Sequence, residues 1–190
     1  YFIALELLVR EKLLRKSEII GSTYKCGLID YAKLFTERYK ILRLAFSRFD
    51  IRQKDFSAFV QEEKFEGYAL FQALKEKFGG ISFDCWPTEY KFAQKRALKK
   101  FRNENSREIL FWLFVQFEVF RQWKNLKAYA NKRGVYIIGD IPLYPAYDSA
   151  DVWLNPQLFK LNPDRSLKKV AGVPPDYFSA TGQLWGNPVY

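Results

Sequence analysis

One segment, residues 106–133, constrains the fold of this chain more than any other stretch. Its apolar residues fall on nearly every side of a helix: Ile109, Phe111, Trp112, Leu113, Phe114, Val115, Phe117 and Phe120. A helix that is apolar all round must be covered on most sides, so we expect it to be largely buried. Polar residues interrupt it at Gln116, Glu118, Arg121 and Gln122, and we expect these to have polar partners or to lie at the surface.

The residues directly after this helix suggest a second element. Gly134 is expected to end the helix, and "VYII" at 135–138 reads as a short buried strand with Asp140 at its carboxyl end. A helix, then a strand with an acid at its tip, is typical of a βα barrel, whose catalytic face lies at the carboxyl ends of the strands. Asp140 is therefore the best single acid by position, and the alternative is a carboxylate that caps a loop.

The first half of the chain is expected to be helical elsewhere as well. Three-to-four spacing of apolar residues and local stop signals predict helices within 1–20, over 31–49, from Asp55 onward, over 67–78 and within 88–101. Asp30 and Asp55 are the expected N-caps of two of these helices. Gly79 and Gly80 are the expected stop of the fourth.

The last part of the chain, residues 142–190, lacks a long periodic pattern. We expect mostly loop there, with one turn of helix near 150–153, and loops that long in a compact domain are usually functional. Asp148 and Asp151 lie three residues apart. Because a calcium ion needs more oxygen ligands than this pair supplies, loop bracing and capping are favoured over a cation site.

The closing stretch, "VAGVPPDYFSATGQLWGNPVY" at 170–190, combines flat apolar rings with polar edges. The rings are Tyr177, Phe178 and Trp185, and the polar side chains are Asp176, Gln183 and Asn187. A sugar presents C–H faces that stack on rings and hydroxyls that bind carboxylates and amides. Sugar binding is one interpretation of this pattern, and packing of the loop on itself is the other.

Composition narrows the remaining classes. The formal charge of +10 would suit a nucleic-acid or membrane-surface binder, but the densest basic cluster, within 95–102, has no accompanying motif and is better explained as a solvated helix face. The absence of histidine excludes a histidine-based triad or metal site within these residues. No apolar run is long enough to span a membrane. Cys26 and Cys85 lack metal-type spacing, which favours a reducing compartment such as the cytoplasm.

Several motifs resemble one family. "IIGDIPLYPAYDSADVW", the closing stretch, "YFIALELLVREKLL", "ALFQALKEKFGG" and "FRQWKNLKAYANKRGVYIIGD" are similar, in order, to the amylomaltases or 4-alpha-glucanotransferases of glycoside hydrolase family 77. The resemblance implies an α/β fold, here a helix-rich part of a (β/α)8 TIM barrel with helical insertions. Residues 1–133 would be the helical insertion and barrel helices. Residues 134–190 would be the third barrel strand and an active-site loop, all within one incomplete catalytic domain.

The activity that the resemblance implies is transfer of 1,4-α-glucan segments between maltooligosaccharides, or to glucose, by a retaining double displacement without a cofactor. Amylose-type glucans would be further substrates, and neither nucleic acid nor membrane would be a partner. The alternatives are a related α-glucan hydrolase and a non-catalytic carbohydrate-binding protein. A chain without methionine that opens on "YFI" is also expected to be an internal piece of a longer protein.

The resemblance assigns substrate-binding roles to seven residues: Asp140, Asp176, Tyr177, Phe178, Gln183, Trp185 and Asn187. Asp140 matches a substrate-side acid at the end of the third strand. Asp176 to Phe178 match a loop over the acceptor cleft. Gln183 and Trp185 match sugar-contacting positions, and Asn187 lines the same wall.

Phe35 falls where some family members place a tyrosine in a secondary glucan-binding groove, and it lacks the hydroxyl. No catalytic residue and no metal ligand is expected within the chain, because the resemblance places the nucleophile and the acid/base beyond Tyr190. The 190 residues alone are therefore expected to be inactive.

Overall fold

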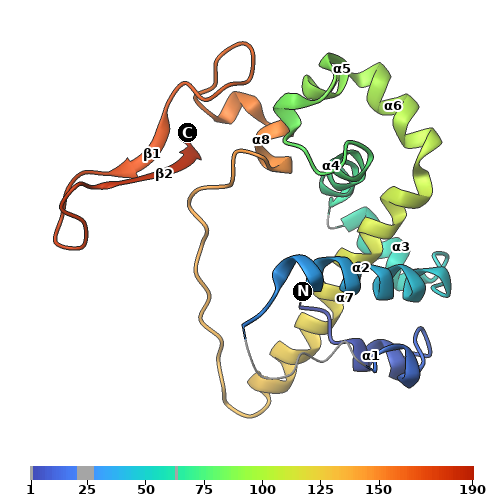
Figure 1. The fold of residues 1–190 in the computed structure, drawn as a ribbon. Helices are drawn as coiled ribbons and strands as arrows, with labels where there is room; N and C mark the ends of the chain where they lie inside the picture. Colours follow the sequence, from blue (N-terminus) through green and yellow to red (C-terminus); the bar gives the residue numbers. More distant parts are fainter. Residues whose placement is uncertain (1, 21–27, 63) are drawn as a thin grey trace. The chain divides into compact units, whose positions relative to one another are not determined.

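The computed structural model describes residues 2–20, 28–62 and 64–190, and these form a helix-rich chain with one β-hairpin (Figure 1). The chain divides into two compact units. The first unit comprises Tyr1–Phe65 and Leu110–Ile138, and the second comprises Glu66–Ile109 and Gly139–Tyr190. The long helix α7 (Ser106–Asn131) begins in the second unit and continues through the first.

The first unit contains α1 (Leu5–Arg10), a 3₁₀ turn (Lys16–Glu18), α2 (Tyr31–Ser47), α3 (Lys54–Glu62) and most of α7. The side chain of Asp30 accepts a hydrogen bond from the Lys33 amide at 3.0 Å, which confirms it as the N-cap of α2. Asp55 is not a cap, because α3 already begins at Lys54. Its charge lies in the first turn, where the helix dipole favours a carboxylate.

A row of phenylalanines forms the core of the first unit. Residues at three-residue spacing on α7 meet residues of α2, α3 and the segment between them, with ring centroids 4.7–5.9 Å apart: Phe111, Phe114, Phe117 and Phe120 against Phe46, Phe49, Phe56 and Phe59. Most of these pairs are tilted or edge-to-face, the geometry that aromatic rings prefer. The expected helix is confirmed, and it is largely buried between Ile109 and Glu118, but residues 123–129 of α7 are exposed.

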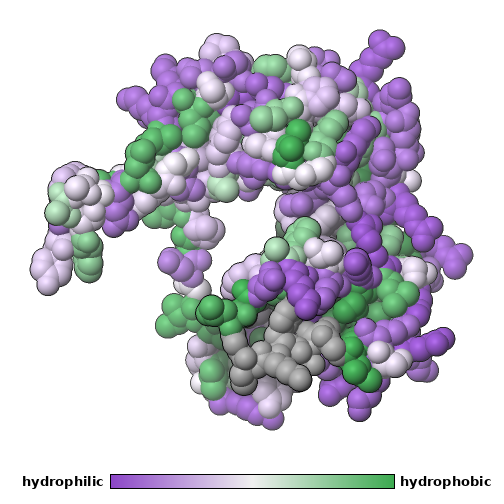
Figure 2. Space-filling model, in the orientation of Figure 1, coloured by the Kyte–Doolittle hydropathy of each residue, from purple (hydrophilic) through white to green (hydrophobic). Residues whose placement is uncertain are grey.

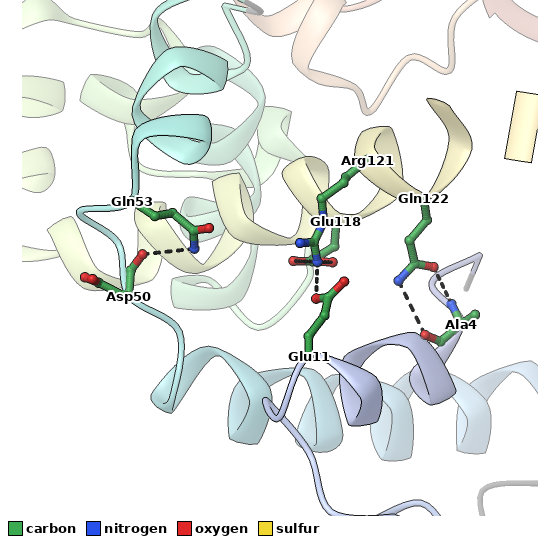
Figure 3. A network of polar contacts seen from close by, with 7 residues as sticks. All are labelled: Ala4, Glu11, Asp50, Gln53, Glu118, Arg121 and Gln122. Carbon is green, nitrogen blue, oxygen red and sulfur yellow. Dashed lines mark hydrogen bonds and ion pairs between the residues drawn. The ribbon is translucent and has the colours of Figure 1, made fainter. Parts of the chain in front are cut away.

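Glu118, Arg121 and Gln122 on α7 have polar partners within the first unit (Figure 3). Glu118 is fully buried, and the Arg121 guanidinium donates to both of its oxygens, at 2.8 and 2.7 Å. Arg121 also pairs with Glu11, the residue that ends α1. The Gln122 amide accepts from the backbone N–H of Ala4 at 2.7 Å and donates to its carbonyl at 3.4 Å. The expectation of partnered polar positions is confirmed for these side chains.

A second ion pair of the first unit predicts a pH dependence. The Arg48 guanidinium donates two hydrogen bonds of 2.7 Å to Glu18, and the Arg15 amide donates another, which together lower the pKa of Glu18 from 4.5 to about 2. Because the folded-state pKa lies below the unfolded one, this stabilisation is present above pH 4.5 and is lost as the pH falls through about 2. We expect Glu18→Gln to lower the thermal midpoint near neutral pH and to flatten its decline below pH 4.5.

The control for this prediction is Glu104→Gln, since Glu104 is an exposed residue paired loosely with Lys100 at 3.8 Å. Its melting profile should keep the slope of the unmodified protein between pH 4.5 and about 2. An unchanged slope in Glu18→Gln would contradict the argument.

The second unit contains α4 (Glu66–Lys77), a 3₁₀ turn (Phe83–Cys85), α5 (Thr88–Lys91), α6 (Lys95–Glu104), α8 (Ala150–Leu154), a 3₁₀ turn (Pro156–Leu158), and strands β1 (Val170–Val173) and β2 (Gln183–Pro188). Gly79 and Gly80 follow α4 with positive φ angles, as expected of a helix stop. The basic helix expected within 88–101 is two helices, because Ala93 turns the chain with φ of 49°. The surface over α6 is mainly hydrophilic (Figure 2), which confirms a solvated basic face.

Two tryptophans hold the core of the second unit. The rings of Trp86 and Trp153 lie 5.7 Å apart, and Phe71 contacts both. The indole N–H of Trp153 donates to the Tyr90 carbonyl at 2.8 Å, so the polar edge of this buried ring is satisfied. Trp153 lies on α8, the single helical turn expected near this point.

The expected strand at 135–138 is not formed, and its four residues are exposed. A buried barrel strand hydrogen-bonds to neighbours on both sides, and within the described ranges the one sheet is the antiparallel pair β1–β2. Apolar sequence predicts a strand there, but it cannot supply the partners. Conversely, β1 and β2 lie in the stretch expected to be mostly loop.

The structure also bears on the expectations about membrane spans and cysteines. Within the described ranges, no helix combines the length and apolar character needed to cross a membrane, α7 included. Cys85 is an exposed free thiol, and Cys26 lies outside the described residues.

Candidate functional site

The seven substrate-binding residues expected from the sequence all lie in the second unit, within residues 139–190. Asp140 lies in an extended, exposed segment, and its carboxylate accepts a hydrogen bond from the Ile141 amide at 2.8 Å. The other six lie on or beside the hairpin of β1 and β2. Val173 pairs with Gln183 and Gly172 with Leu184, so the loop between the strands runs from 174 to 182.

The hairpin loop is organised by the carboxylate of Asp176. Its Oδ1 atom accepts from the amides of Phe178 at 2.9 Å and Ser179 at 2.8 Å, and the Asp176 amide donates to the Ser179 carbonyl at 2.9 Å. The Ser179 hydroxyl then donates to the Gly182 carbonyl at 2.7 Å. The sequence suggested a residue that faces substrate, and it gave no signal that Asp176 also folds the loop.

The folded loop presents two rings to solvent. Tyr177 is 97% exposed and Phe178 is 87% exposed, and the rings lie edge to face with centroids 5.6 Å apart. Large rings held in water by a rigid turn are typical of a binding surface rather than of a core. Within the described residues, the loop-packing alternative therefore does not account for this pair.

Gly182 is a position where the loop requires glycine. Its φ is 73°, and a Cβ there would lie 2.6 Å from the Val173 carbonyl oxygen. We expect Gly182→Ala to lower the free energy of hairpin opening by about 2 kcal/mol, through left-handed strain and this clash. Hydrogen exchange of the β1 and β2 amides measures the opening.

Gly186 provides the matched control, since its φ is 78° but nothing lies within 4 Å of a Cβ built on it. Gly186→Ala should carry the strain without the clash, about 1 kcal/mol. Equal protection loss in the two variants would show that the close approach at Gly182 has no energetic role.

Strand β2 carries an aromatic surface with an amide beside it. The indole N–H of Trp185 donates to the Gln183 side-chain oxygen at 3.0 Å, which fixes the two side chains relative to each other. The ring of Tyr144 lies 5.9 Å from that of Trp185, and Tyr144 also stacks on Tyr190. Neither tyrosine carries a local sequence signal for this role, although both lie in the segments that carry the family resemblance.

Asn187 braces the site from within. Its amide donates to the Pro145 carbonyl at 2.9 Å, and the Tyr190 hydroxyl donates to the Leu143 carbonyl at 2.8 Å. These bonds tie the end of the chain to the segment that follows Asp140. A pocket of about 460 Å³ adjoins this junction, and Asp151, Asn155 and Tyr190 are among the residues that line it.

The remaining expectations have separate outcomes. Phe35 lies on α2 in the first unit, 49% exposed, with its ring 4.6 Å from that of Tyr39. Asp148 braces a loop, as expected, because it accepts from Lys75 and from the Phe83 amide. In the part of the chain that the structure describes, no group of three potential ligands could hold a metal ion.

Tyr147 is a partly buried phenol near the candidate site. Burial, followed by the charge of Asp84, raises the pKa of Tyr147 to about 12, and its hydroxyl donates to the Arg165 carbonyl.

Comparison with known proteins decides the family. Residues 1–190 match the model of glycoside hydrolase family 77, which is described as 4-alpha-glucanotransferase. The chain belongs to family 77. The resemblance inferred from the motifs is thereby confirmed over the whole chain.

Relatives within family 77 are similar in both sequence and fold. The chain is 43% identical to a 4-alpha-glucanotransferase of Clostridium butyricum, over all of this chain and 40% of that protein. It is 42% identical to one of Aquifex aeolicus, over 97% of this chain and 38% of that protein. An amylomaltase from Streptococcus agalactiae, solved in complex with acarbose, is 37% identical with a TM-score of 0.92, over 99% of this chain and 39% of that chain. The chain thus spans about 40% of the length of the family 77 relatives it matches.

Proposed function

We propose that the protein containing these residues is a 4-alpha-glucanotransferase that moves 1,4-α-glucan segments between maltooligosaccharides or onto glucose. The observation that carries the proposal is the match to family 77 over every residue of the chain. The relatives with that name share about two fifths of their length with it. Amylose-type glucans are further proposed substrates, and the cytoplasm is the proposed location.

The fold we propose for the whole catalytic domain is a (β/α)8 barrel with helical insertions. Residues 134–140 would be its third strand, and residues 1–133 would supply insertion and barrel helices. The exposed apolar side chains at 135–138 support this assignment, since barrel strands are apolar and buried by their neighbours. Asp140 would then lie at the catalytic face.

The chemistry proposed is a retaining double displacement. A carboxylate outside these residues attacks the anomeric carbon, while a second carboxyl group gives its proton to the departing glucan oxygen. The acceptor hydroxyl then returns a proton to that second group and displaces the enzyme carboxylate. No cofactor enters either step.

The residues of this chain would bind and orient the sugars. Tyr177 and Phe178 offer rings on a loop that its own hydrogen bonds stiffen, which suits a cover that keeps water from the intermediate. Trp185 and Gln183 offer a stacking face beside an amide. Asp140 offers an exposed carboxylate to sugar hydroxyls.

The test is incubation of the full-length protein with maltotriose. Glucanotransferase activity gives a ladder of longer glucans together with glucose. Glucose and maltose alone would instead support the hydrolase alternative. Binding of maltotriose without any product would support the carbohydrate-binding alternative, and the 190 residues on their own are expected to give no product.

A further inference from the structure

We infer that Lys75 and Asp148 form a positioning pair that fixes the sugar-binding face of β2 on the helical core of the second unit. The pair lies outside the residues that the family motifs suggested as substrate contacts. Its effect on glucan transfer rests on the proposed function, whereas its effect on sugar binding by β2 does not require catalysis.

The ammonium group of Lys75 has three hydrogen-bond acceptors around it. The Nζ atom of Lys75, in the last turn of α4, donates to the carbonyls of Gly80 at 2.6 Å and Ile81 at 2.9 Å, and to Asp148 Oδ2 at 2.5 Å. An ammonium group has three protons, and this geometry uses all of them. The two side chains are mostly shielded from solvent, so salt screens the pair less than an exposed one.

The other carboxylate oxygen of Asp148 also has a partner in the helical core. Asp148 Oδ1 accepts from the Phe83 amide at 3.1 Å, at the start of the 3₁₀ turn that follows α4. The carboxylate therefore bridges the end of α4 and this turn, both parts of the helical core. The converging acceptors suit the compact ammonium of lysine, and the planar guanidinium of arginine cannot reproduce the arrangement.

The segment just before Asp148 connects this residue to β2 and the end of the chain. The residues just before it, 143–145, make three contacts with the end of the chain. The Pro145 carbonyl accepts from Asn187, the Leu143 carbonyl accepts from the Tyr190 hydroxyl, and the Tyr144 ring packs 5.9 Å from Trp185. A shift of this segment would therefore move Trp185, and the segment is anchored by Asp148.

The expected consequence is weaker sugar binding with little change in the chemical step. Neither Lys75 nor Asp148 carries a proposed substrate contact, so the loss should appear in the acceptor KM and Kd rather than in kcat. Small misplacements of a binding group reduce rates by up to about 100-fold, and we expect about tenfold in acceptor KM for Lys75→Met. Lys99→Met, which removes an exposed lysine of α6, should leave this KM unchanged.

A double-mutant cycle separates positioning from general stability. If Lys75 acts through Trp185, Lys75→Met should raise the acceptor KM about tenfold in the unmodified full-length protein and by less than about twofold in the Trp185→Ala background. Lys75→Arg should not rescue, and Asp148→Asn should reproduce the Lys75→Met result. Additive effects of Lys75→Met and Trp185→Ala would overturn the inference.

Failure of the inference and failure of the proposed function remain distinguishable. If the unmodified protein transfers glucans but the cycle is additive, the positioning role is wrong and the function stands. If the unmodified protein transfers nothing, the cycle is read from the Kd for maltotriose, with the same criterion. Should Lys75→Met fail to fold, Asp148→Asn takes its place in the cycle.

Discussion

Replacing Trp185 with alanine in the full-length protein is expected to lower kcat/KM for glucan transfer about 100-fold, the scale of losing one central aromatic anchor. The indole is held by its bond to Gln183 and by the Tyr144 ring, so it offers a stacking face that is already in place. Trp185→Phe keeps a ring but loses the N–H donor, and it should reduce kcat/KM by less than about tenfold. Initial rates with maltotriose measure both variants.

The matched control is Trp123→Ala. Trp123 and Trp185 are both 47% exposed, but Trp123 lies on α7 in the first unit and carries no proposed sugar contact. Its replacement removes the same ring from a similarly exposed position and should leave kcat/KM unchanged. Equal losses in the two variants would contradict a specific role for Trp185.

Arg121→Met is expected to destabilise the protein by about 3–5 kcal/mol, because it leaves the fully buried Glu118 without its cation. The double variant Glu118→Leu with Arg121→Met should be more stable than Arg121→Met alone, since it removes the unpaired buried charge as well. The exposed pair of Arg52 and Asp50 provides the control, and Arg52→Met should cost less than about 1 kcal/mol. Chemical denaturation near neutral pH measures these differences.

The pH dependence of the Arg121 variant follows from the buried carboxyl group. Burial raises the pKa of Glu118, and the Arg121 guanidinium opposes that shift. A raised folded-state pKa contributes stability below the unfolded pKa of about 4.5, and this contribution is lost as the pH rises through the folded value. Without Arg121 the folded pKa should rise further. The penalty of Arg121→Met should therefore be smallest in acid and largest near neutral pH, and a penalty independent of pH would contradict this account.

Local signals predicted local structure well. The all-round apolar pattern from 106 onward predicted a helix that is buried between Ile109 and Glu118, Asp30 predicted the N-cap of α2, and Gly79 with Gly80 predicted the end of α4. Each of these depends on residues within a few turns of one another. The division of the chain at residue 133 remains a prediction, as do the roles of the seven substrate-binding residues.

Features that depend on distant partners were predicted poorly. The strand at 135–138 needs neighbouring strands that are absent from the described ranges, so its apolar sequence stays exposed. The β1–β2 hairpin was missed because β1 has only four residues and β2 is exposed along most of its length, so neither strand shows a long alternating pattern. The side-chain types at the candidate site were evident in the sequence. The hydrogen bonds through which Asp176 folds the hairpin loop and Asn187 ties β2 to Pro145 were not evident in the sequence.

The path of α7 through both units has a consequence for synthesis on the ribosome. Residues 66–109 emerge before residues 110–138, which complete the phenylalanine core of the first unit. The first unit can therefore close while the second still lacks residues 139–190. Until those residues are synthesised, the apolar side chains of α4 and Trp86 stay partly exposed to solvent. Chaperone contacts late in translation should accordingly concentrate on 66–109, because this stretch still lacks its partners within 139–190 after the first unit can close.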